Sequence, residues 1–186
     1  MLGRSALSSA AECGHSSLVQ LLLEAGAQKE LREWEGKTTL TFAAEHGHDA
    51  CVQILLDAGA QQDARTGDRS TALMAAARGG HAAIVQLLLG AGAGMDLIDI
   101  ESKTALMHAA FHGHAEVVQL LLEAGAQRDL RDFDGETALH HAGITTIRLP
   151  VVKLLLEAGA DKHVRNNDGE TPLIQSLLEA SEVEQL

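Results

Sequence analysis

The stretch VVQLLLEAGA, residues 117–126, decides the fold, because the chain contains four close variants of it. These are LVQLLLEAGA (18–27), CVQILLDAGA (51–60), IVQLLLGAGA (84–93) and VVKLLLEAGA (151–160). Self-similarity at a fixed period is typical of repeat architectures, in which each repeat is one small supersecondary unit. We therefore expect a row of similar units, with function carried by the residues that differ between them.

A second motif gives the same period. The leucine of the TTL, TAL and TPL segments aligns in a series with steps of 33, 33, 33, 33 and 34 residues: Leu7, Leu40, Leu73, Leu106, Leu139 and Leu173. Unrelated helices would not keep this register. We expect one domain over residues 1–186, with repeats at about 1–31, 32–64, 65–97, 98–130 and 131–164 and a partial repeat at 165–186.

Each repeat predicts two short helices followed by a loop. Residues 38–47 (TTLTFAAEHG) fit the first helix, because the Thr38 hydroxyl can cap its N-terminus and Gly47 can adopt the positive φ that ends a helix. Residues 49–58 (DACVQILLDA) fit the second helix, with apolar residues at helical spacing. The polar run at 60–69 predicts a projecting, hairpin-like loop.

A helix pair of this size cannot bury its apolar face alone. Stacking gives each pair two neighbours, so the array is stable where one pair is not. We therefore expect an all-α solenoid of stacked helix-turn-helix units, with Leu55, Leu88 and Leu121 buried between units. The aromatic content of only 2% agrees with a core of Leu, Ala, Val and Ile in closely packed helices.

The first helices share a motif, written TTLTFAA (38–44), TALMAAA (71–77), TALMHAA (104–110), TALHHAG (137–143) and TPLIQSL (171–177). A Gly-His pair follows the first helix in four repeats, at 14–15, 47–48, 80–81 and 113–114. Both motifs resemble the signature of the ankyrin repeat, and the resemblance covers essentially the whole chain. It implies an ankyrin-repeat solenoid with projecting β-hairpin-like loops, in which the turn histidines hydrogen-bond backbone groups.

The fifth repeat departs from the pattern. It reads HHAGITTIRLPVVKLL (140–155), with one extra residue and no Gly-His turn, and we expect its second helix to begin near Pro150. Two interpretations stay open: the change is neutral drift, or it reshapes a contact surface. Arg69 and Ser102 also replace the loop glycine of the other repeats.

Charge and cysteine content exclude some classes of protein. The formal net charge is −12 and no run is rich in Lys or Arg, which argues against a nucleic acid or an anionic membrane as the partner. Cys13 and Cys51 make neither a disulfide framework nor a metal-binding spacing. No signal-peptide-like or membrane-spanning run occurs. We therefore expect a cytoplasmic protein in a reducing environment.

No catalytic or cofactor-binding motif stands out. The chain lacks G-x-S-x-G, H-E-x-x-H, the phosphate-binding loop and G-x-G-x-x-G. His108 and His112 are four residues apart on one predicted helix, so zinc ligation is an alternative, although no carboxylate or cysteine obviously joins them. We expect no enzymatic activity, no metal and no cofactor. Paired loop acids recur with the repeat and fit loop chemistry and solvation: Glu33 with Glu35, and Asp132 with Asp134.

The variable columns of the repeat predict the binding surface. Stacking does not use the concave face or the loop tips, which usually bind the partner in ankyrin-like arrays. Three of the four aromatic side chains fall in these columns, and exposed aromatics flanked by arginine are typical of binding hot spots. An acidic column would surround them: Glu35, Asp68, Glu101, Asp134 and Asp168. The predicted partner-binding residues are Trp34, Arg65, Arg78, Ile98, Ile100, Phe111, His112, Arg131, Phe133 and Ile144.

Three functions stay open. The first is a non-catalytic protein-interaction scaffold, whose partner carries basic groups around an apolar centre. The second is a regulatory or substrate-docking segment of a larger enzyme or channel, and the third is an engineered or generated scaffold without a natural ligand.

We expect a monomer, and two alternatives remain for the variable columns. The chain could self-associate through one continuous apolar patch of Ile98, Ile100, Phe111, Phe133 and Ile144. Conversely, each loop-tip aromatic could fold over its own hairpin and the arginines could pair with loop acids, in which case neither binds a partner.

Overall fold

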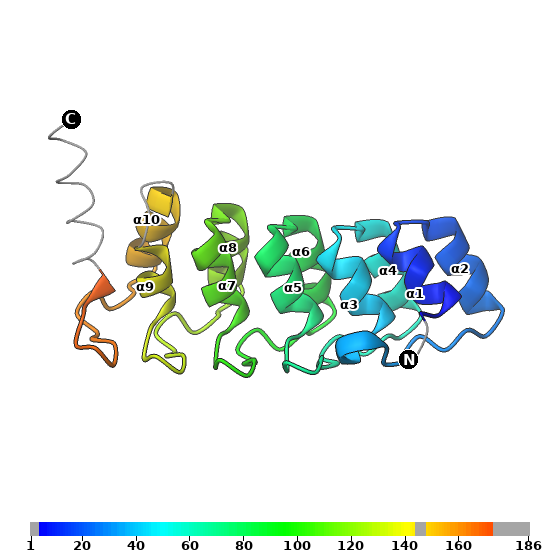
Figure 1. Ribbon diagram of the computed structural model, residues 1–186. Coiled ribbons are helices and arrows are strands. Elements are labelled where there is room, and N and C mark those ends of the chain that lie inside the picture. Colours follow the sequence, from blue (N-terminus) through cyan, green and yellow to red (C-terminus); the bar gives the residue numbers. More distant parts are fainter. Residues whose placement is uncertain (1–3, 144–147, 173–186) are drawn as a thin grey trace, which may run out of the picture.

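The helices of the described residues form five pairs that stand side by side in a row (Figure 1). The computed structural model describes residues 4–143 and 148–172. These residues contain helices and turns but no β-strand, so the expected all-α array is confirmed. The first helices of the pairs are α1 (Ala6–Glu12), α3 (Thr39–Glu45), α5 (Ala72–Gly79), α7 (Ala105–His112) and α9 (Ala138–Ala142). The second helices are α2 (Ser16–Glu24), α4 (Asp49–Asp57), α6 (Ala82–Gly90), α8 (Ala115–Glu123) and α10 (Leu149–Glu157).

Threonine side chains begin three of the first helices, as predicted for α3. Thr38, Thr71 and Thr104 each accept a hydrogen bond from a backbone N–H one turn further on. These bonds satisfy donors that an α-helix leaves unpaired at its N-terminus. The predicted start of the fifth second helix is also confirmed, because Pro150 lies in the first turn of α10.

The core lies between the pairs. The first helices pack on one another in a row, and the second helices pack in a parallel row beside them. Leu55, Leu88, Leu121 and Leu155 each lie at 0% exposure, at one equivalent position per second helix. Paired alanines of the first helices, such as Ala76 and Ala77, are equally buried, which lets neighbouring helices approach closely. The predicted burial of the repeated leucines is confirmed.

The turn histidines join each pair to the one before it. The Nε2 atom of His48 lies 2.8 Å from the carbonyl oxygen of Glu12, and that of His114 lies 3.0 Å from the carbonyl oxygen of Arg78. His81 makes the equivalent contact at 3.3 Å. Each ring thus reaches a carbonyl near the end of the preceding first helix, where helical partners run out. The expected bonding of these rings to backbone groups is confirmed for these three turns.

Arg148 replaces the turn histidine in the fifth pair. Its side chain lies against Gly113, as the ring of His114 lies against the equivalent glycine one repeat earlier. An Nη1 hydrogen bond of 2.8 Å runs from Arg148 to the carbonyl oxygen of His141. The guanidinium also lies 4.8 Å from the ring centroid of Phe111. The altered turn therefore keeps a contact with the preceding pair, by a different side chain.

The loops hydrogen-bond to one another along the array. Each is closed by a backbone bond across its tip, such as Asp132 N to Glu136 O at 2.9 Å. Successive loops are joined by bonds such as Phe133 N to Glu101 O at 3.0 Å. The loops are therefore hairpin-like turns that form one continuous edge, below the helices in Figure 1.

Two sequence-based expectations concern residues that the structure does not describe. Ile144, a predicted binding residue, lies outside the described part of the chain, and so do residues 173–186 of the partial sixth repeat. Among the described residues, no helix has the length and apolar character needed to cross a membrane.

We expect the stacking leucines to carry the stability of the array. Leu121→Ala should lower the free energy of unfolding by about 2–5 kcal/mol, because it removes a side chain with 0% exposure and leaves a cavity between pairs. Leu149→Ala is the matched control, since Leu149 is 63% exposed. Urea titration followed by circular dichroism measures both. Equal losses for the two variants would contradict the stacking argument.

Candidate functional site

Loop tips expose three large apolar side chains. Trp34 lies in the 3-10 turn η1 (Trp34–Gly36) and is 68% exposed, Ile100 is 60% exposed and Phe133 is 78% exposed. These values agree with the columns that the sequence leaves outside the core, while Phe42, the fourth aromatic residue, is buried. Large apolar groups held in solvent by an ordered backbone are a feature of interaction surfaces.

A hollow of about 350 Å³ lies between α5, α7 and the two loops beneath them, and we call it the central hollow. It brings together four of the predicted residues: Arg78, Ile100, Phe111 and His112. Phe111 is 43% exposed and meets the His112 ring edge-on, with 5.1 Å between centroids. Met107, which the sequence did not single out, adds to the wall. The central hollow thus combines apolar side chains with two cations and three carboxylates, which are Arg78, Lys103, Asp68, Asp99 and Glu101.

The remaining predicted residues do not join the central hollow. Trp34 and Phe133 project from loop tips that do not line it, and Ile98 is half-buried. The single apolar patch stays a prediction, because Ile98 is half-buried and Ile144 lies outside the described residues. Among the described residues, Ile100 and Phe111 line the central hollow, while Trp34 and Phe133 do not.

The arginines that open the loops donate hydrogen bonds to backbone carbonyl groups. Arg65 donates from Nη1 to the carbonyl oxygen of Ile98 at 2.9 Å. Arg131 donates from Nη2 to the carbonyl oxygen of Arg165 at 2.8 Å and from Nε to that of Gly135 at 3.0 Å. The expectation that these side chains pair with loop acids is corrected: each reaches across to the next loop. A partner contact by Arg65 or Arg131 stays a prediction.

Some loop acids are buried, contrary to the expectation of solvated carboxylates. Asp132 is 7% exposed, and its Oδ1 accepts hydrogen bonds from the backbone N–H groups of Asp134 and Glu136 at 3.0 and 2.8 Å. Its Oδ2 lies 2.8 Å from Nε2 of His141. Asp99 makes the same set of contacts one repeat earlier, with His108 as the ring. These carboxylates fasten each loop to the first helix that follows it.

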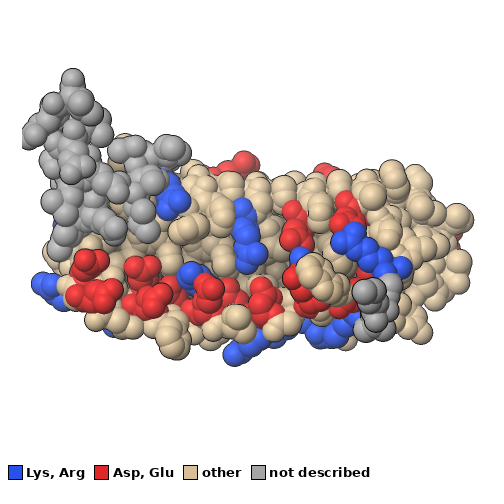
Figure 2. Space-filling view, viewed as in Figure 1, with Lys and Arg blue, Asp and Glu red and all other residues tan. Residues whose placement is uncertain are grey.

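The other loop acids form a row on the surface. Five exposed carboxylates follow the loop edge, and Figure 2 shows acidic side chains gathered along this side of the array. Hydrogen bonds from Thr66 and Ser70 hold the pKa of Asp68 below its ordinary value, although partial burial alone would raise it. We call this set the acidic row: Glu35, Asp68, Glu101, Asp134 and Asp168.

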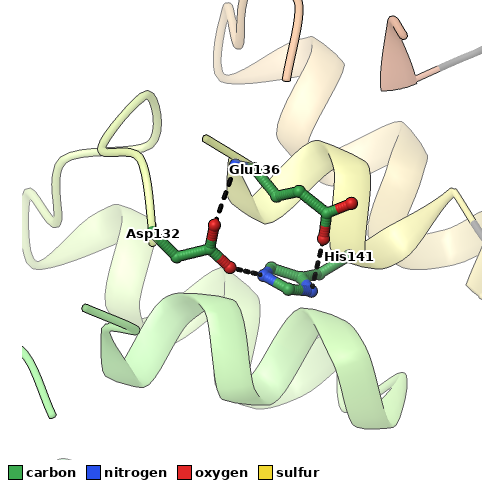
Figure 3. Close-up of side chains that lie close together, drawn as sticks. All are labelled: Asp132, Glu136 and His141. Carbon is green, nitrogen blue, oxygen red and sulfur yellow. Dashed lines mark hydrogen bonds and ion pairs between the residues drawn. The ribbon is translucent and has the colours of Figure 1, made fainter. Parts of the chain in front are cut away.

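One cluster in the described residues has the composition of a metal site (Figure 3). The ring of His141 lies between two carboxylates, with Nε2 2.8 Å from Asp132 and Nδ1 3.6 Å from Glu136. Because the carboxylates face opposite nitrogens, an ion at Nδ1 would gain Glu136 as its only other protein ligand. Zinc sites use three or four protein ligands. The arrangement fits an imidazole ring held between two acidic side chains.

The suggested zinc pair is engaged in other contacts. Nε2 of His108 lies 2.8 Å from Asp99, and Nδ1 of His112 lies 2.9 Å from the carbonyl oxygen of His108. No third ligand joins these two rings among residues 4–143 and 148–172. Burial lowers the pKa of His108, and the hydrogen bond with Asp99 only partly offsets this effect.

Comparison with known families identifies the class of protein. The family model described as ankyrin repeats (3 copies) matches residues 2–66 and 61–132, and the model of a single ankyrin repeat matches residues 134–167. The chain therefore belongs to the ankyrin-repeat family. A search of curated proteins found no match. Ankyrin repeats are generally protein–protein interaction modules and are typically not enzymes.

We expect His108 to make the array sensitive to acid. Its folded-state pKa lies below the ordinary 6.5, so the unfolded chain binds more protons between these two values. The contribution is complete above about pH 6.5 and is lost as the pH falls through the folded-state pKa. His108→Gln should therefore flatten the loss of unfolding free energy between neutral and mildly acidic pH, measured by urea titration. Parallel curves for wild type and variant would rule this out, and exposed His163→Gln is the control.

Arg148 should stabilise the altered turn of the fifth pair. We expect Arg148→Ala to lower the free energy of unfolding by about 1 kcal/mol, because it removes the bond to the His141 carbonyl and the contact with the Phe111 ring. Lys153→Ala is the control, because Lys153 is exposed on α10, the helix that Arg148 precedes. Its ion pair with Glu157 spans 3.8 Å and should contribute little to stability. Thermal denaturation compares the two. An equal or larger loss of stability for Lys153→Ala would contradict the proposal that Arg148 takes the place of the turn histidine.

Proposed function

We propose that this chain is a non-catalytic scaffold that binds a protein partner with its concave face and loop tips. The observation that carries the proposal is the exposure of Trp34, Ile100, Phe111 and Phe133 on surfaces that stacking does not use, while the leucines of the core are fully buried. A fold that needs these groups only for stability would bury them, since exposed aromatics gain nothing from the solvent. Their position at variable columns supports a role in recognition.

The central hollow supports an anchor point for one apolar side chain of the partner. Ile100 and Phe111 supply its exposed apolar surface, and Phe111 contacts both the Arg148 guanidinium and the His112 ring. Arg78 lines the same space, and no hydrogen bond or ion pair engages its guanidinium among the described residues. It is available to a carbonyl or carboxylate next to the anchoring side chain. A walled hollow of this kind suits the fully desolvated contacts that dominate binding energy.

The acidic row supports a partner with basic groups around its apolar anchor. Five carboxylates lie along the loop edge, next to the exposed apolar tips, and the whole chain carries −12. Complementary charge mainly raises the rate of association and excludes wrong partners. We infer that the natural ligand is an extended or loop segment with one or two large apolar residues flanked by Lys or Arg.

Preorganisation is the proposed mechanism of binding. The backbone bonds between loops and the buried Asp99 and Asp132 hold the loop tips before any partner arrives. Little needs to be ordered on binding, so less conformational entropy is lost. Free thiols at exposed Cys13 and buried Cys51 support the further proposal of a reducing, cytoplasmic location.

A displayed library of random peptides tests this proposal, because it samples many candidate recognition segments at once. Immobilised wild-type protein should enrich sequences that combine an aromatic or aliphatic residue with Lys or Arg. The triple variant Trp34→Ala, Phe111→Ala, Phe133→Ala should lose this enrichment and keep its helical signal, because Trp34 and Phe133 are largely exposed and only Phe111 has a stabilising contact, with Arg148, to lose.

The matched control changes three exposed residues on second helices: Gln53→Ala, Gln86→Ala and Gln119→Ala. This control should keep the enrichment of the wild type. Identical enrichment by the aromatic triple variant would refute the chosen surface, and enrichment of acidic sequences would refute the chemistry of the partner.

A further inference from the structure

The outer side of the α1–α2 pair is apolar and uncovered among the described residues. Leu18 is 42% exposed, whereas the equivalent residues of the other second helices, Cys51, Ile84, Val117 and Val151, lie at 0–1%. Leu22 is half-buried, whereas its equivalents lie at 0%. Leu21 reaches 62% exposure, against half-buried equivalents in the other pairs. We call the surface formed by Ala6, Leu18, Leu21 and Leu22 the N-terminal face.

The equivalent face of each of the other four pairs is covered, and the structure shows by what. Helices α4, α6, α8 and α10 each bury the equivalent side against the second helix of the preceding pair. The cover is therefore always an amphipathic helix of the same kind. An apolar face of this kind that is exposed to solvent is a site of association. The N-terminal face has the chemistry of the internal contacts between pairs.

Charge favours a second copy of this chain as the cover. The segment CGHSSLVQLLL, residues 13–23, contains no Lys, Arg, Asp or Glu. Elsewhere the chain carries the acidic row and a net charge of −12, so two copies repel one another over most of their surface. The N-terminal face can meet its own copy without opposing carboxylates. An isologous contact needs a self-complementary patch, and a ridge of leucines on one helix meets that condition.

We propose that the protein forms a symmetric dimer in which the N-terminal faces of two copies pack against each other, α2 on α2. Leu18, Leu21 and Leu22 of each copy form the centre of this contact. The interface uses only the N-terminal face, so both concave faces, both central hollows and both acidic rows stay open. The dimer presents two binding surfaces, which would strengthen binding to a partner with two recognition segments by raising the effective concentration.

Sedimentation velocity over a wide range of protein concentration tests the proposal. Wild type should convert reversibly from monomer to dimer. Leu21→Glu should weaken dimerisation by roughly tenfold or more, because a buried leucine contact is replaced by a carboxylate facing its own copy. Leu149→Glu, at a residue 63% exposed on α10, is the matched control and should dimerise as wild type does. A wild type that stays monomeric, or a dimer unaffected by Leu21→Glu, would overturn the proposal.

Cross-linking tests the geometry without relying on a destabilising change. In a Cys13→Ser background, Leu21→Cys should give a covalent dimer with a short bis-maleimide, and Leu149→Cys should not. If cross-linking instead requires a mixture of the two cysteine variants, the copies pack head to tail and the symmetric arrangement is wrong.

The dependence on salt concentration distinguishes dimerisation from the peptide binding of the proposed function. Dimerisation through an uncharged face of an acidic protein should strengthen as salt screens the repulsion between copies. Capture of basic peptides by the acidic row should weaken under the same conditions. Dimerisation that weakens with salt would contradict the uncharged interface. The peptide result stands or falls independently, because Leu21→Glu leaves the concave face unchanged.

Discussion

Every other feature of this array depends on the burial of one leucine from each of the second to fifth helix pairs against a neighbouring pair. Leu55, Leu88, Leu121 and Leu155 reach 0% exposure only because a second pair lies against each of them. A single pair would leave them in water, so no pair folds by its own contacts. The stack therefore commits two sides of each pair to its neighbours and leaves the concave face, the loop tips and the ends for other uses.

In addition to the apolar core, hydrogen bonds of buried polar side chains hold the loops in place. Buried Asp99 and Asp132 close their own loops and bond the next first helix, while Arg65 and Arg131 reach the backbone of the following loop. Buried polar groups are retained when every atom finds a partner, and here most partners are backbone groups. The consequence is that apolar tips are held away from the core at small cost. Flexible loops would let the same side chains collapse onto the nearest apolar surface.

The period of the sequence predicts the fold because equivalent positions have equivalent neighbours. Helix ends, buried leucines and the exposure of Trp34 and Phe133 all follow from it. The direction of long polar side chains does not follow, since an arginine can point to solvent, to an acid or to a carbonyl one repeat away. Asp99 with His108 and Asp132 with His141 share a spacing of nine residues. This spacing is a signal from which the two Asp–His contacts could have been predicted. Arg148 gave no such signal, because the insertion moves it out of the histidine column.

The concave face and the N-terminal face differ in how they relate to folding. Side chains on the concave face are not needed by the stack, so they can change with the partner while the array keeps its stability. Leu18 and Leu22 have the residue type that stacking requires, and they keep it on a side where no pair lies against them in the described structure. Association through the N-terminal face would use the same apolar burial that holds the pairs together. Like the core, it would tolerate exchanges between apolar residues of similar volume. Specificity then rests with the concave face, and the end contact supplies only the number of concave faces that one assembly presents.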